Sequence, residues 1–247
     1  MSERRVTAES MAGVLPRSTI TTANNGKPKR GGARPNAGRK KSAAFRFDPS
    51  HAARPELSFE HPVHVMLRTV ASVPRLRQRA GYEAIRRTLV HFVNSDDFRV
   101  VHISIQRNHL HLVVEAAHKQ ALRRGMQRFA IRAARALNEG FDREGKVFAF
   151  RYRAKQITSA SYARNVISYV LNNWRRHRQD HRTGEMSMPF DRFSSAASFV
   201  GWSVSCRDKP SDDPDPLPVS RPRTELLRFD WELFGLIDPF EVPGPLA

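Results

Sequence analysis

The chain has 247 residues, enough for one domain of ordinary size with extensions. It carries 42 Lys and Arg against 24 Asp and Glu, a formal net charge of +18, and such a surplus is typical of proteins with a polyanionic partner. The single cysteine excludes a disulfide framework and a cysteine-based zinc site. No stretch approaches the length of a transmembrane helix, and the first residues lack an apolar signal segment, so we expect no membrane contact and an intracellular protein.

The charge is unevenly distributed along the chain. Residues 1–54 have a net charge of +9, residues 55–183 of +14 and residues 184–247 of −5. We predict a disordered basic tail over the first range, a folded domain over the second and a C-terminal extension over the third. Within the extension, residues 208–222 have the composition of a linker, and residues 226–240 form a short amphipathic segment.

Residues 27–41 of the basic tail resemble an AT-hook. Pro35 holds the backbone extended after Arg34, and the surrounding glycines allow a close approach to a narrow minor groove. We expect Arg34 and Arg39 to contact DNA in this way. A basic linker that binds phosphates without reading the base sequence explains the same residues equally well.

The central region alternates between strand and helix patterns. Its order is β-α-β-β-α-β followed by one more helix, which predicts an α+β fold of the ferredoxin-like type. In that arrangement an antiparallel four-stranded sheet has two helices on one face, and the additional helix is free to lie across the other. We predict strands at residues 61–69, 98–106, 108–115 and 147–157, and helices at residues 74–94, 118–139 and 158–177, the last capped by Thr158 or Ser159.

Two histidines lie two residues apart in the third predicted strand. Because side chains alternate along a strand, His109 and His111 point to one face while Leu110 and Leu112 point to the other. Two neutral imidazoles side by side provide half of a metal site. Alternatively, the same pattern is produced by two half-exposed histidines on a strand that bind no ligand. Glu115 has the same-face spacing and would either assist a metal or pair with an arginine.

A tyrosine and a carboxamide lie one turn apart on the last predicted helix. Tyr169 and Asn173 are at i and i+4, so they share a helix face. Phosphodiester transfer needs a cation to neutralise the phosphate and an oxygen nucleophile in line with the leaving group. Tyr162 is the rival nucleophile, but its i+4 residue, Val166, cannot bind a metal. Alternatively, Tyr169 is an aromatic residue that packs at the edge of the core and takes no part in catalysis.

Basic side chains cluster on two predicted elements and are candidates for DNA contact. Aromatic residues interleave with them near residue 150, as in grooves that stack single-stranded bases, although the same rings would also serve a core. The candidates are Arg124, Arg128, Arg132 and Arg135 on the second helix, and Arg151, Arg153 and Lys155 on the fourth strand.

With these residues in view, the chain resembles the REP-associated tyrosine transposases, which belong to the HUH single-strand transposases with an IS200-like transposase domain. The resemblance covers residues 61–177. It includes Asn108-His109-Leu110-His111, the aromatic segment 148–152 and the run Tyr169-x-x-Asn172-Asn173. Trp174 stands where the family commonly has proline.

This resemblance implies an HUH transposase fold in which the last helix carries the nucleophile. It implies a divalent metal, Mg²⁺ or Mn²⁺, held by His109, His111 and Asn173, with Tyr169 as the catalytic nucleophile. The implied substrate is single-stranded or hairpin DNA, cleaved and rejoined through a 5′-phosphotyrosine intermediate at repeated hairpin sequences. The implied location is the bacterial cytoplasm, in association with the nucleoid.

Two questions stay open at this point. The tyrosine either serves its own subunit or reaches the site of a neighbour in a homodimer. The alternative function is a transposase-derived protein that binds nucleic acid without cutting it.

Overall fold

The computed structural model describes residues 56–93, 95–203 and 216–246, so the tail with its AT-hook-like segment, Arg34 and Arg39 lies outside the described residues. None of the helices in these ranges is long and apolar enough to cross a bilayer. In chain order the elements are β1 (Val63–Arg68), α1 (Arg79–Val90), β2 (Phe98–Ile105), β3 (His109–Ala116), α2 (Lys119–Gly140), β4 (Arg153–Gln156), α3 (Ala160–Arg176), α4 (Gln179–Thr183), η2 (Ser195–Ser198), α5 (Glu225–Arg228) and η3 (Asp230–Phe234).

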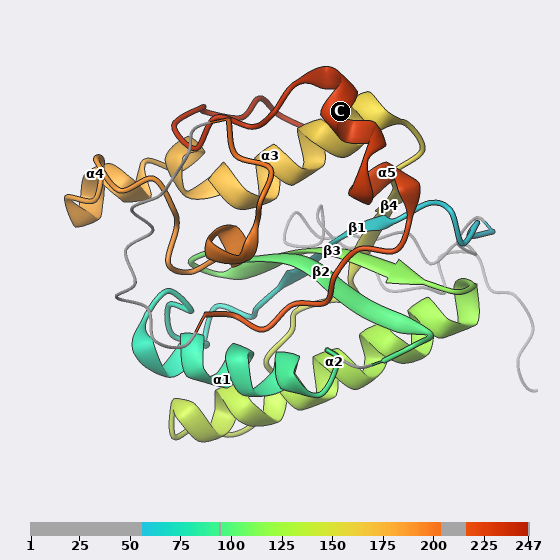
Figure 1. Ribbon diagram of the computed structural model, residues 1–247. Helices are drawn as coiled ribbons and strands as arrows, with labels where there is room; N and C mark the ends of the chain where they lie inside the picture. The colour runs from blue at the N-terminus through green and yellow to red at the C-terminus, as the bar shows by residue number, and fades with distance from the viewer. Residues whose placement is uncertain (1–55, 94, 204–215, 247) are drawn as a thin grey trace, which may run out of the picture. The chain divides into compact units, whose positions relative to one another are not determined.

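The four strands form one antiparallel sheet in the order β2-β3-β1-β4. Helices α1 and α2 cover one face of this sheet, and α3 lies on the other (Figure 1). This is the ferredoxin-like βαββαβ arrangement with an added helix, so the predicted α+β class is confirmed. It matches the fold that the resemblance to the HUH transposases implies.

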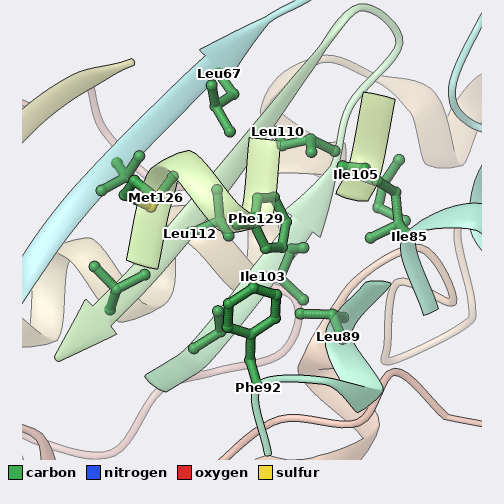
Figure 2. Close-up of a cluster of buried hydrophobic side chains, with 14 of the residues drawn as sticks. Leu67, Ile85, Leu89, Phe92, Ile103, Ile105, Leu110, Leu112, Met126 and Phe129 are labelled. Atoms are coloured by element: carbon green, nitrogen blue, oxygen red, sulfur yellow. The ribbon is translucent and has the colours of Figure 1, made fainter. Parts of the chain in front are cut away.

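A fully apolar core fills the space between the sheet and helices α1 and α2 (Figure 2). Leu110 and Leu112 of β3 point into it and meet Phe129 of α2, and all three are inaccessible to solvent. Burying such side chains supplies most of the driving force for folding. Because strand side chains alternate, this core fixes the other face of β3 as the one that carries its histidines.

Helix α3 covers the second face of the sheet through an apolar stripe. The hydroxyl of Ser159 accepts a hydrogen bond from the Tyr162 backbone N–H at 3.3 Å, which begins the helix as predicted. The stripe packs on Val101 of β2 and Val113 of β3. Its members are all buried, and they are Ala163, Ile167, Val170 and Trp174.

The C-terminal residues 235–243 run along α3 and are tied to it by a series of hydrogen bonds. Asn172 donates to the Asp238 carbonyl at 2.9 Å, and Arg175 donates to the Pro239 carbonyl at 2.8 Å. Arg164 pairs with Glu241 at 3.1 Å. The described part of the extension therefore packs on the domain, while the division at residue 183 stays a prediction.

Two predicted elements have wrong boundaries: α1 ends at Val90 rather than at residue 94 and, like β4, begins later than predicted. Helix α1 begins at Arg79 rather than Pro74, because the segment before it bonds elsewhere: the Leu76 N–H donates to the Arg107 carbonyl at 2.9 Å, and Arg77 pairs with Asp191 at 2.8 Å. These contacts hold the segment out of the helix.

The fourth strand is also shorter than predicted and begins at Arg153 instead of Val147. Val147 and Phe148 both pack against the core beneath the sheet. Adjacent residues of a regular strand point to opposite faces, so the backbone bends between residues 149 and 151 instead of continuing the strand.

Gly125 lets α2 approach the sheet closely, which generates a stability prediction. A Cβ at this position would lie 2.1 Å from the Phe98 ring, which is completely buried. Alanine is normally favoured over glycine inside a helix by about 1 kcal/mol. We nevertheless expect Gly125→Ala to lower the free energy of unfolding by about 1 to 3 kcal/mol in urea titrations, because the helix must shift.

The matched control is Gln127→Ala on the exposed face of the same helix, which should change stability by less than about 0.5 kcal/mol. A Gly125→Ala variant at least as stable as the wild type would contradict this close packing.

Candidate active site

The two predicted histidines lie on the face of β3 that α3 covers. His111 is buried and His109 is partly buried. Their Nε2 atoms face each other at 3.0 Å. The pair therefore presents two imidazole nitrogens to one point between the sheet and α3, as the strand pattern predicts.

A third histidine, which the sequence analysis does not identify, completes this row. His64 comes from β1, the strand beside β3, and its Nε2 lies 3.0 Å from Nδ1 of His111. The signal is present in the sequence, since His64 alternates with Val63 and Val65 and so shares a face with Met66. Using it requires knowing that β1 pairs with β3.

The histidine rings form one connected series of contacts that ends on a carboxamide. Nδ1 of His109 lies 2.9 Å from Oδ1 of Asn108, which can only accept a hydrogen bond.

Burial lowers the pKa of His64 to about 4, with Lys155 adding to the effect. Burial likewise lowers the pKa of His109 to about 4, helped by the nearby His177 and Arg68, and holds the pKa of His111 well below its usual value. At neutral pH the rings are uncharged, as metal ligands must be.

Helix α3 places Tyr169 over these histidines. The Tyr169 ring lies 5.3 Å from that of His111 and 6.2 Å from that of His64, measured between centroids, and it meets both edge to face. Two turns further along, His177 lies 6.4 Å from His109 by the same measure. Tyr169 and His177, at positions i and i+8, therefore both lie over the row formed by His64, His109 and His111.

Asn173 is the residue between them on this face, at i+4. It is completely buried, yet neither its amide nitrogen nor its oxygen has a hydrogen-bond partner in the protein. A buried amide without partners costs about 1 to 3 kcal/mol. The neighbouring Asn172 is also buried, but its amide donates to the Asp238 carbonyl. An unpaired oxygen at this place is available to a ligand.

These residues fit a divalent cation. Within the described ranges no group of three or more His, Cys, Asp or Glu side chains could hold a metal ion, so a third ligand beside the histidines must be of another type. The unpaired Asn173 amide is of a type that could supply it. Two imidazole nitrogens and an amide oxygen form a mixed donor set that leaves positions open for substrate oxygens.

A cavity of about 330 Å³ opens beside Tyr169 and gives access to the site. Three cationic side chains line it, Arg153 and Lys155 from β4 and Arg176 from α3. Tyr162, the rival nucleophile, lines the same cavity, with the Lys155 ammonium 4.7 Å from its ring centroid. The cavity is lined by His64, Met66, His111, Arg153, Ala154, Lys155, Tyr162, Tyr169, Arg176, Pro245 and Leu246.

The other predicted DNA contacts within the described residues do not line this cavity. The four arginines of α2 are exposed, and α2 covers the opposite face of the sheet from α3, the helix that carries Tyr169 (Figure 1). Among them, Arg124 donates to Gln120 at 3.2 Å and Arg128 lies 3.8 Å from Asp97. Arg151 is exposed in the bend before β4. The structure thus brings Arg153 and Lys155 to the site but not Arg124, Arg128, Arg132 and Arg135.

Of the two roles predicted for Glu115, assisting a metal or pairing with an arginine, the structure shows the second. Its carboxylate lies 3.3 Å from Nε of Arg99 and accepts hydrogen bonds from Thr224, whose backbone N–H and hydroxyl are both 2.8 Å away. It therefore anchors the C-terminal extension to the end of β3.

Comparison with known proteins identifies this arrangement. Residues 58–173 match the family model described as transposase IS200 like. This part of the chain is an IS200-like transposase domain. The predicted family resemblance is confirmed, and the matched range holds His64, His109, His111, Tyr169 and Asn173. Such transposases are DNA-cleaving enzymes.

Solved structures also resemble the transposase domain. Among them is the structure of a REP-associated tyrosine transposase bound to a REP hairpin, with a TM-score of 0.40 and 11% sequence identity. The alignment covers 59% of this chain and 83% of that one. A comparison with curated proteins gave no match.

The unpaired amide of the transposase domain leads to a test of stability. We expect Asn173→Leu to raise the free energy of unfolding in the presence of EDTA by about 1 kcal/mol, because it removes a buried polar group without partners. The adjacent control, Asn172→Leu, should lower it by about 1 kcal/mol, because it leaves the Asp238 carbonyl unpaired. Urea titration measures both. Equal destabilisation by the two variants would mean that the Asn173 amide has a partner in the folded protein.

Proposed function

We propose that this protein is a metal-dependent tyrosine transposase that cleaves and rejoins single-stranded DNA. Tyr169 is the nucleophile, and His109, His111 and Asn173 hold the divalent cation, Mg²⁺ or Mn²⁺. The substrate is a repeated sequence that folds into a hairpin. Because that substrate is genomic DNA, we expect the protein to act in the cytoplasm at the nucleoid.

One observation carries this proposal: the ring of Tyr169 lies 5.3 Å from that of His111. A phenol at this distance brings its oxygen near any ion between the two imidazoles. Both residues belong to the same chain, so we further propose that each subunit assembles its own site. A homodimer is then not required for chemistry.

The reaction is an in-line displacement at phosphorus. The Tyr169 oxygen loses its proton and forms a bond to phosphorus as the bond to the 3′ oxygen breaks. The released strand takes up a proton and ends in a 3′-OH, while the other end stays on the protein as a 5′-phosphotyrosine. A second 3′-OH reverses these steps and frees Tyr169. Since one phosphodiester bond is exchanged for another of similar energy, rejoining needs no ATP.

The side chains around the cavity favour this chemistry by position and charge. A cation held there would neutralise charge on the non-bridging phosphate oxygens and stabilise the attacking phenol oxygen. Arg153 and Lys155 on β4 and Arg176 on α3 line the cavity and attract the phosphates on either side of the cleaved bond. The α2 arginines, on the far layer, are candidates for contacts to the DNA outside the site.

Covalent capture tests the proposal. Oligonucleotides carrying candidate hairpins are labelled at the 3′ end and mixed with protein and Mn²⁺. We expect a labelled adduct that survives SDS, because the fragment on the 3′ side of the cut keeps the phosphotyrosine. The same oligonucleotides labelled at the 5′ end should yield no labelled protein. EDTA should abolish the adduct, and Tyr169→Phe should abolish it while DNA binding is retained.

Tyr82→Phe, which changes a tyrosine that packs on Phe193 away from the cavity, is the matched control and should leave adduct formation unchanged. Tyr162→Phe tests the rival nucleophile and should still give the adduct. An adduct that persists in Tyr169→Phe but is lost in Tyr162→Phe would reassign the nucleophile. Binding of the hairpin with no adduct in Mg²⁺ or Mn²⁺ would support a DNA-binding protein without cleavage activity.

A further inference from the structure

We propose that His64 is a positioning residue for the metal site, which it serves by accepting a hydrogen bond from Nδ1–H of His111. This bond holds the His111 ring with Nε2 directed at His109 and fixes the tautomer that leaves Nε2 unprotonated. The inference rests on the proposed function and adds a residue to it. His64 itself does not touch the reacting atoms in this role.

The two proposed metal ligands are held in the same way. In each ring Nε2 points inward, and the two Nε2 atoms are 3.0 Å apart. In each ring Nδ1 points outward to a partner, Asn108 Oδ1 at 2.9 Å for His109 and His64 Nε2 at 3.0 Å for His111. A neutral imidazole has one N–H, so donation from Nδ1 leaves the Nε2 lone pair for a metal. Partners of this kind orient metal-binding histidines and raise their basicity.

The contact between His64 and His111 has the geometry of a hydrogen bond rather than of ring stacking. The ring planes differ by 16° and the centroids are 5.2 Å apart. Because the two nitrogens are only 3.0 Å apart, the rings meet end to end through their edges. The lone pair of an imidazole nitrogen lies in the ring plane, so this arrangement aligns N–H with its acceptor.

Burial alone does not account for the contact, as another histidine on the same face of the sheet shows. His102 of β2 is 7% exposed and packs against the edge of Phe199, yet its Nδ1 has no hydrogen-bond partner in the structure. His64 instead has its Nε2 on a proposed ligand and its ring 6.2 Å from that of Tyr169. His102 is therefore the matched control.

Mn²⁺ binding to the full chain without DNA tests this proposal, with free Mn²⁺ measured by EPR. We expect His64→Leu to weaken Mn²⁺ binding by about 10- to 100-fold, as loss of such partners does at other metal sites. His64→Gln should stay within about threefold of the wild type, because its Oε1 offers an acceptor at a similar reach. His102→Leu should leave the affinity unchanged.

The proposed metal site and the role of His64 can be overturned separately. If wild-type protein binds Mn²⁺ no better than His109→Ala or Asn173→Leu, the proposed metal site fails. If those variants lose binding while His64→Leu matches His102→Leu, only the role of His64 is overturned. If His64→Leu does not fold, histidine ¹⁵N NMR of the Mg²⁺-bound wild type decides. A His111 protonated at Nδ1 supports the proposal, and one protonated at Nε2 overturns it.

Discussion

The packing of α3 across the sheet is the constraint on which the site depends. The apolar stripe of this helix, which includes Ile167 and Trp174, is buried, and that burial fixes the rotation of the helix about its axis. This rotation places Tyr169 over His111 and His64, and Asn173 follows one turn later on the same helix face. Hydrogen bonds from α3 to residues 235–243 hold the helix from its other side.

The proposed site lies on only one face of the sheet, the one that α3 covers with its apolar stripe. The face toward α1 and α2 is lined by aliphatic and aromatic side chains, whereas the α3 face carries a row of three histidines. Burial keeps these rings neutral and leaves the Asn173 amide without a partner. Both features cost stability in a protein without a ligand, and both prepare nitrogen and oxygen atoms for a cation. The buried groups that cost stability are thus the same groups that we propose to bind the cation.

Sequence periodicity predicted the order of strands and helices along the chain, a third helix capped by Thr158 or Ser159, and the shared face of His109 and His111, because these depend on local spacing. Helix α1 began later and β4 shorter than predicted, because tertiary contacts override local patterns. His64 was missed for a related reason: its partner lies 47 residues away on another strand. The α2 arginines lie away from the site because α2 and α3 cover opposite faces of the sheet. The number of charges along the sequence does not reveal this.

The central claim is that one chain brings a phenol to an ion between paired imidazoles. Anomalous diffraction at the manganese edge, from crystals of the full chain grown with Mn²⁺, tests it most directly. The account predicts a single strong peak within bonding distance of His109 Nε2, His111 Nε2 and the Asn173 amide oxygen, with the Tyr169 hydroxyl of the same chain facing it. A peak elsewhere, or a Tyr169 ring turned away from an ion at that place, would contradict it.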